Sequence, residues 1–333
     1  MTRLRLIVVA VGALTLVACV GPEDRPSKVH DLRVLGVRTD PPELMAPACI
    51  FDVSAAQGPL VQQAFTIWST PIRYTALIAD PAGNGREISW ELWTCADPGD
   101  RTCSNEGDPR FRLGGGVTVG GELVVEQLPL GLTGVDIDRL ANGDPSGALL
   151  FEVLQRDPYK GFDSIRVPLN LHVKAGDEEI WAQKLVPYSC NYFPKAEGAP
   201  GPTMRPNVQP ELPGVTIDGK PWREDEVVAL TGPGPFVAEP LPYEDLEENF
   251  VRPSFQLEPV ETKESWKVAW YADLGFFSPE ESGGANLGGV EERVRSEWSP
   301  GSTATEKDVT FWFVVRDGRG GQSWLTRHAH WRP

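Results

Sequence analysis

Two histidines and one acidic loop are the places where this sequence could hold a metal ion. His328 and His330 lie two residues apart in an extended run, so both imidazoles point to one face of a strand and could bind zinc together. Residues 136–144 (DIDRLANGD) crowd three aspartates and an asparagine into one stretch, and such oxygen ligands suit calcium. A polar strand face and a short helix with polar caps are the simpler interpretations, because the loop lacks the spacing of an EF-hand. We predict no metal site and no cofactor, and leave calcium binding by this loop open.

Catalytic motifs are absent from the sequence. It contains no G-x-S-x-G, H-E-x-x-H or S-x-x-K pattern and no phosphate-binding loop. His30 lies in a polar stretch and His172 on the polar side of a strand, and neither has an evident nucleophile to activate. We therefore expect a protein that is not an enzyme and has no catalytic residues. The alternative is a carbohydrate-active or other hydrolytic enzyme whose site is built from scattered loop carboxylates.

Tryptophan offers a second alternative, a glycan-binding module, because exposed indole rings can stack on sugars. The chain has 11 tryptophans. Strand patterns predict that five of them pack in cores, namely Trp90, Trp93, Trp266, Trp270 and Trp312. The patterns leave four others open, Trp181, Trp222, Trp298 and Trp324.

Five cysteines divide into one near the N-terminus and an even set farther on. Cys49, Cys95, Cys103 and Cys190 form that even set, which in an oxidising compartment indicates two disulfides. A metal site would need short paired spacings such as C-x-x-C, and none occurs. The count alone allows three pairings.

The N-terminus carries the signs of export. Arg3 and Arg5 precede an apolar run over residues 6–18 that is too short for a bilayer-spanning helix of roughly twenty residues. Residues 16–19 (LVAC) resemble the lipobox of bacterial lipoproteins. The resemblance implies cleavage after Ala18, a diacylglyceryl thioether on Cys19 and a further acyl chain, such as palmitate, on the new amino group. Residue 20 is Val rather than Asp, which in that family implies an outer-membrane location, on either face.

Composition limits the partners. The chain of 333 residues is 41% hydrophobic and 23% charged, with a formal net charge of −16. Such an acidic balance argues against nucleic acid, since affinity for phosphate backbones comes from clusters of lysine and arginine. We expect the membrane, through the lipid on Cys19, and an envelope protein or glycan as partners, and no nucleic acid.

The elements that must position these residues repeat once along the chain. Alternating apolar runs separated by a short turn predict long hairpins over residues 165–188 and 308–331. A tryptophan-bearing strand precedes each hairpin, at residues 88–95 and 266–275. The pattern predicts an all-β protein with two tandem immunoglobulin-like β-sandwiches. The expected segments are a signal peptide over 1–18, a lipidated tether over 19–30, sandwiches over 31–190 and 213–333, and a Pro/Gly-rich linker over 191–212.

The mature chain also resembles the tandem Ig-like lipoproteins typical of myxobacteria. The phrases LRVLGVRTDPPE (32–43), AWYADLGFF (269–277) and FWFVVRDGRGGQSW (311–324) carry the likeness. These are framework strands and turns, so the resemblance implies a fold and an anchored location and no activity. In many Ig-like sandwiches the first strand runs parallel to the last, which suggests the pairs Cys49–Cys190 and Cys95–Cys103.

Overall fold

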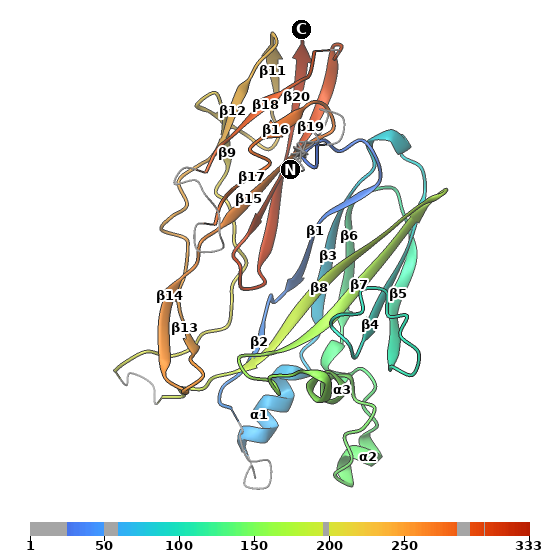
Figure 1. Cartoon of the computed structure of the whole chain (residues 1–333), viewed down its shortest axis with the longest axis vertical. Coiled ribbons are helices and arrows are strands. Elements are labelled where there is room, and N and C mark those ends of the chain that lie inside the picture. The colour runs from blue at the N-terminus through green and yellow to red at the C-terminus, as the bar shows by residue number, and fades with distance from the viewer. Residues whose placement is uncertain (1–24, 50–58, 196–199, 285–293, 303) are drawn as a thin grey trace, which may run out of the picture.

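The chain folds into β-sheets that pack as two sandwiches (Figure 1). The structure is a computed structural model that describes residues 25–49, 59–195, 200–284, 294–302 and 304–333. The core of the first sandwich draws its residues from Leu32 to Tyr188, and that of the second from Leu212 to Trp331. The all-β prediction is confirmed. No helix among the described residues is long and apolar enough to cross a membrane.

The first sandwich packs a sheet of order β1-β3-β6 against a sheet of order β2-β8-β7-β4-β5. Its strands are β1 (Arg33–Asp40), β2 (Leu44–Ala46), β3 (Ile72–Ala79), β4 (Ile88–Cys95), β5 (Arg110–Thr118), β6 (Gly121–Leu128), β7 (Ile165–Ala175) and β8 (Glu178–Cys190). Three helices lie at one end of it (Figure 1), α1 (Pro59–Trp68), α2 (Ile137–Ala141) and α3 (Leu149–Arg156), together with a 3-10 turn at Leu130–Leu132. A second 3-10 turn, at Pro81–Gly83, follows β3 at the opposite end.

In strand β7 the alternation of apolar residues in the sequence matches their burial in the core. Val167, Leu169, Leu171 and Val173 alternate inward and are fully buried, as the predicted hairpin requires. Asn170 points the other way and is buried too, because the loop between β4 and β5 covers the outer face of the sheet there. The alternation of buried and exposed residues along β7 therefore ends where the β4–β5 loop covers the outer face of the sheet.

The expected tryptophan at the centre of the first core is missing. Trp90 is half-buried over Gly114 and Gly116 of β5, and Trp93 lies on the outer face, where its indole donates to Glu91 at 3.2 Å. The prediction of core packing is wrong for Trp93, because residues three apart on a strand point to opposite faces, whereas Trp90 packs against the edge of the first core. Aliphatic side chains and two buried tyrosines fill the space instead.

The second sandwich packs a sheet of order β10-β9-β12-β18-β16 against one of order β11-β20-β19-β15-β17. Its strands are β9 (Val215–Ile217), β10 (Lys220–Trp222), β11 (Val227–Thr231), β12 (Phe236–Pro240), β15 (Lys267–Ala272), β16 (Phe276–Ser278), β17 (Glu281–Gly283), β18 (Ser296–Ser299), β19 (Lys307–Arg316) and β20 (Gln322–Arg332). Here tryptophan does fill the centre. Trp270 is fully buried and meets Phe313 edge-on, with ring centroids 5.5 Å apart.

Each sandwich is closed by a parallel pair of strands. Strand β2 runs parallel to the end of β8, and β11 runs parallel to β20. The first closure brings Cys49 beside Cys190, whose Cα atoms are 4.8 Å apart across a disulfide, and Cys95 bonds Cys103. Both predicted pairs are confirmed. Cys49 and Cys190 meet because parallel strands end at the same edge of a sheet, whereas Cys95 and Cys103 close a short loop after β4.

The segment expected to be a polar tether is packed from its middle onward. Ser27 and Val29 are fully buried against the second sandwich, where the Val29 amide donates to the Ala272 carbonyl at 2.8 Å and the Ala272 amide donates to Ser27 at 2.9 Å. The N-terminal end thus adds to β15 before the chain enters the first sandwich. The expectation of a free tether over 19–30 is corrected for residues 25–30, since an alternating Ser-Lys-Val run can pair with a strand. Residues 19–24 lie outside the described part.

The predicted linker is likewise part of the structure where it is described. The Gln209 side chain accepts from the Gln322 amide at 2.9 Å and donates to the Thr39 carbonyl, so it joins β20 to β1. Met204, Asn207 and Leu212 are buried. Proline keeps this segment out of the sheets, but its polar side chains still connect them.

A separate hairpin leaves the second sandwich. Strands β13 (Asn249–Pro253) and β14 (Pro259–Lys263) pair only with each other among the described residues. The hairpin extends away from the second sandwich toward the helical end of the first (Figure 1).

Candidate binding groove between the sandwiches

The two sandwiches meet through an apolar cluster of their own. It joins Val29 and side chains from β1 and β3 to side chains from β15, β19 and β20, the strand residues being Leu35, Leu77, Ala79, Ala269, Trp312, Val314 and Trp324. The Trp324 indole donates to Glu122 at 2.6 Å, and the Arg38 guanidinium lies 4.7 Å from the ring centroid. Gly36 lets the strands approach, because a Cβ there would lie 3.0 Å from the Trp324 ring. Trp312, predicted to pack in a core, packs in this interface.

The turn between β19 and β20 anchors the separate hairpin, β13–β14, to the first sandwich. The Arg319 guanidinium lies 3.0 Å from Glu248 and from Glu264, 3.7 Å from Glu43 and 4.2 Å from the centre of the Phe250 ring. These partners come from three separate stretches of chain. Because the Arg319 side chain is only 13% exposed, the ion pairs are shielded from solvent and hold the base of the hairpin in place.

Two further charged residues, Asp317 and Lys184, are buried next to this turn. The Asp317 carboxylate accepts from the backbone amides of Arg319, Gly320 and Gly321 and from the Asn207 side chain at 2.7 Å. Burial raises the pKa of Asp317 above its ordinary value, against the effect of these hydrogen bonds. Lys184, on β8 of the first sandwich, donates to the Gly320 carbonyl, and burial lowers the pKa of Lys184 to about 8.

Two connected chambers lie between the hairpin and the first sandwich. The larger has a volume of about 730 Å³ and the smaller about 350 Å³. They share Asp163, Ser164, Arg166, Leu185 and Arg252, so they form one groove. We call this feature the interdomain groove. One wall comes from the first sandwich and the other from β13 and the tip of the hairpin.

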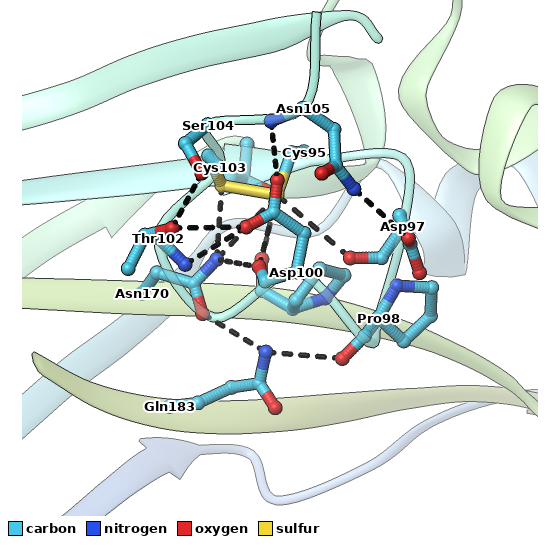
Figure 2. The surroundings of a disulfide bond; sticks show 12 residues. Cys95, Asp97, Pro98, Asp100, Thr102, Cys103, Ser104, Asn105, Asn170 and Gln183 are labelled. Atoms are coloured by element: carbon cyan, nitrogen blue, oxygen red, sulfur yellow. Dashed lines mark hydrogen bonds between the residues drawn. A yellow bond between two sulfur atoms is a disulfide. The ribbon is translucent and has the colours of Figure 1, made fainter.

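A disulfide-bonded loop supplies the rim of the larger chamber (Figure 2). Within it, the Asp100 carboxylate accepts from the amides of Thr102 at 3.1 Å and Asn105 at 2.8 Å. Burial of Asp100 raises its pKa, but these hydrogen bonds outweigh burial and bring the pKa below the ordinary value. The Cys95–Cys103 bond and Asp100 together fix a loop that has no regular secondary structure.

Two amide side chains fasten this loop to the sheet. Asn170 on β7 donates to the Asp100 carbonyl at 3.2 Å and to the Cys103 sulfur at 2.9 Å. Gln183 on β8 donates to the Pro98 backbone carbonyl at 3.1 Å and to the Asn170 side-chain Oδ1 at 3.0 Å (Figure 2). Pro98, with its two neighbours, is thereby held at the groove edge.

Two arginines without partners face the groove. Arg166 comes from β7 and Arg252 from β13, so they belong to opposite walls. Both are exposed, and neither side chain has a hydrogen bond or ion pair within the described part of the chain. Arg156, also in the larger chamber, is by contrast paired with Asp108 at 2.8 Å and with Glu152 at 2.9 Å.

Aromatic rings stand at the mouth of the larger chamber. Phe255, at the tip of the hairpin, stacks on Phe162 of the first sandwich with centroids 5.0 Å apart and an interplanar angle of 15°. Tyr159 lies beside them, its ring centroid 6.4 Å from that of Phe255. Phe255 is 77% exposed and Tyr159 64% exposed, which is unusual for rings that also contact one another.

The predicted metal candidates have protein partners instead. His330 lies between Asp308, 2.7 Å from Nδ1, and Glu306, 2.8 Å from Nε2, and these hydrogen bonds raise its pKa. His328 faces the same exposed side and contacts Thr310 at 3.4 Å. No group of three or more histidine, cysteine or carboxylate side chains that could bind a metal occurs in the described ranges.

The acidic loop is a capped helix. Asp136 caps α2 by accepting from the amides of Asp138 at 3.0 Å and Arg139 at 3.1 Å. Asp144 accepts from the Arg139 side chain at 2.8 Å, and hydrogen bonds from Ser146 and Arg139 lower the pKa of Asp144 to about 2. The interpretation of residues 136–144 as a helix with polar caps is confirmed.

The four tryptophans that the sequence left open line neither chamber of the groove. Cys19 is outside the described residues. Trp222, Trp298 and Trp324 are buried, and Trp181 stacks on His172 on the outer face of β7 and β8. The groove residues Arg166, Arg252, Phe162 and Phe255 were not singled out from the sequence. The one available signal was the phenylalanine of PSFQLEP (253–259), an aromatic residue in a turn bounded by prolines.

Comparisons with known proteins add little. No family model and no curated protein matches the chain. Among solved structures, Escherichia coli alpha-2-macroglobulin activated by porcine elastase is 8% identical, with a TM-score of 0.23 over 93% of this chain and 22% of that chain. Dimeric latent PorU from Porphyromonas gingivalis is 10% identical, with a TM-score of 0.21 over 79% and 22% of the two chains. Red sea bream transglutaminase is 8% identical, with a TM-score of 0.19 over 91% and 32%. The chain thus spans a third or less of each of these proteins, and likenesses this weak carry no argument about function.

Proposed function

We propose that this protein is a lipid-anchored component of the cell envelope, attached to the outer membrane through Cys19, and that it binds a ligand in the interdomain groove without catalysing a reaction. The observation that carries the binding role is the pair of arginines on opposite walls, Arg166 and Arg252, which have no partner among the described residues. Charged groups and aromatic rings that line one cavity are typical of a ligand site.

Two of the three carboxylates that line the larger chamber, Asp157 and Asp97, are better suited to holding their loops than to hydrolysis. Asp157 accepts from the amides of Tyr159 at 3.0 Å and Gly161 at 2.6 Å, and Asp97 accepts from the Gly99 amide at 2.8 Å. Each of these carboxylates therefore holds its own loop. A general acid or a nucleophile needs a carboxylate directed at the substrate, so these two are poorly suited to either role.

The fold also suits an anchor on Cys19. Arg25 is six residues beyond Cys19, and a fully extended chain spans at most about 3.5 Å per residue. The point where the chain enters the fold would then lie within roughly 20 Å of the lipid. That point is beside the second sandwich, whereas the larger chamber is lined by residues of the hairpin tip and of α3. Both of these elements lie toward the helical end of the first sandwich (Figure 1). The anchor and the mouth of the groove are thus separated along the molecule.

The anchor is tested with Cys19→Ala in a bacterium that processes lipoproteins. We expect the wild-type chain in the membrane fraction with incorporated lipid label, and the variant in the soluble fraction without it. A variant that stays in the membrane fraction and keeps its lipid label would refute the role of Cys19.

The groove is tested by sedimentation with envelope fragments of a Gram-negative bacterium. We expect the mature chain with Cys19→Ser to be water-soluble and to sediment with the fragments, whereas the double variant R166E/R252E stays in the supernatant. Equal sedimentation of both proteins would exclude the groove as the site. Release of new reducing ends or peptides from the fragments would show that the protein is an enzyme.

A further inference from the structure

We infer that the interdomain groove takes an acidic polysaccharide whose sugar rings carry carboxylates, an inference that rests on the proposed binding function. The groove is less acidic than the protein as a whole. The protein has a formal net charge of −16, yet five arginines and four carboxylates line the two chambers. Arg166 and Arg252 lie in both chambers and are free to pair. A planar guanidinium matches a carboxylate with two parallel hydrogen bonds, so an anionic ligand is favoured over a neutral one.

The aromatic rings select the shape of the ligand. Phe162 and Phe255 stack across the gap between the first sandwich and the hairpin, and Tyr159 adds a further exposed face. The flat apolar side of a sugar ring packs well on such a surface through dispersion and removal of water. Rings and guanidinium groups side by side therefore fit a unit that is flat on one side and charged at its edge, as a uronic acid is.

The composition of the walls argues against a peptide. Proline occurs on both walls, at Pro98 and Pro158 in the first sandwich and at Pro253 in the hairpin, and Pro187 lines the smaller chamber. Proline has no backbone N–H, so these positions cannot donate to a peptide added along a strand edge. Addition of a peptide strand is therefore disfavoured at these positions, and side chains have to supply much of the recognition, as they do when a polysaccharide is bound.

Continuity of the groove argues for a polymer. The chambers, of about 730 and 350 Å³, share five residues, so the space runs from the hairpin tip to the Arg319 turn. Two further arginines, Arg205 and Arg319, line the smaller chamber, and Arg319 is already paired with Glu264. Successive acidic sugars can thus meet successive arginines along one path.

Calorimetry with the soluble mature chain tests this inference. The probes are an oligogalacturonate, a maltooligosaccharide of the same length and an oligoglutamate of the same charge. We expect binding of the oligogalacturonate only, and about tenfold weaker binding, near 1.4 kcal/mol, for either Arg166→Gln or Arg252→Gln. Arg223→Gln is the matched control, because Arg223 is exposed and lies outside both chambers. We expect it to bind as the wild type does.

Each other result overturns the inference. Equal affinity for the maltooligosaccharide would show that the arginines do not select charge, and equal or tighter binding of the oligoglutamate would assign the groove to an acidic peptide. Arginine variants that bind like the wild type would place the ligand elsewhere. If envelope sedimentation persists while the oligogalacturonate does not bind, the acidic-glycan inference fails and the proposed function stands.

Discussion

Removal of the Cys49–Cys190 disulfide should cost the first sandwich far more stability than removal of Cys95–Cys103. In the chain-entropy description, a disulfide stabilises by restricting the unfolded chain, and the effect grows with the logarithm of the closed loop. The sequence separation is 141 for the first pair, which gives about 5 kcal/mol at 25 °C, and 8 for the second, which gives about 2.5 kcal/mol. We therefore expect the double variant C49A/C190A to lose about twice as much unfolding free energy as C95A/C103A.

The assay must report on the first sandwich alone, because the chain has two cores. Hydrogen exchange of the amides in β7, whose inward side chains are fully buried, gives that local unfolding free energy. Sedimentation of the two variants with envelope fragments is a useful second measurement, since only Cys95–Cys103 shapes the groove rim. If C95A/C103A lost as much stability as C49A/C190A or more, contacts such as those of Asn170 would outweigh loop closure, and the entropy argument would be refuted.

Three further outcomes test the interface and the charged groups. Gly36→Val should lower the unfolding free energy by about 1–3 kcal/mol and Gly36→Ala by less, measured by thermal unfolding, because a Cβ meets the Trp324 ring at 3.0 Å; unchanged melting of both variants would contradict the close approach. Lys184 has its pKa lowered to about 8 in the fold, so the unfolded state binds more protons between that value and 10.5, and stability should rise with pH there by about 3 kcal/mol. That rise should vanish in Lys184→Met, as followed by urea unfolding, and a slope that persists would mean another group causes it. Hydrogen bonds raise the pKa of His330, so its contribution to stability is present at low pH and lost as pH rises through the folded pKa; an NMR titration should show the pKa falling in Asp308→Asn, and a pKa that does not move would exclude this partner.

The sequence by itself determined the elements whose signals are local. Period-two alternation and Gly-rich turns placed the hairpins β7–β8 and β19–β20, because each strand needs only its own apolar face to be recognised. The capped helix at Asp136 follows from hydrogen bonds within three residues. The Cys49–Cys190 bond could be anticipated because the parallel closure of an Ig-like sandwich fixes which strand ends meet. Even the outward position of Trp93 was available, since it stands three residues from Trp90 on one strand.

The tertiary structure alone decided the groove. Arg166 and Arg252 are separated by a whole domain boundary in the chain, and nothing near either residue indicates that they share a cavity. They meet because the Trp324 cluster and the Arg319 ion pairs dock the second sandwich and its hairpin on the first. The burial of Ser27 and Val29 has the same origin, since the strand they join lies more than two hundred residues away. Contacts between distant segments depend on the complementarity of two folded surfaces. No local sequence pattern within either segment indicates that complementarity.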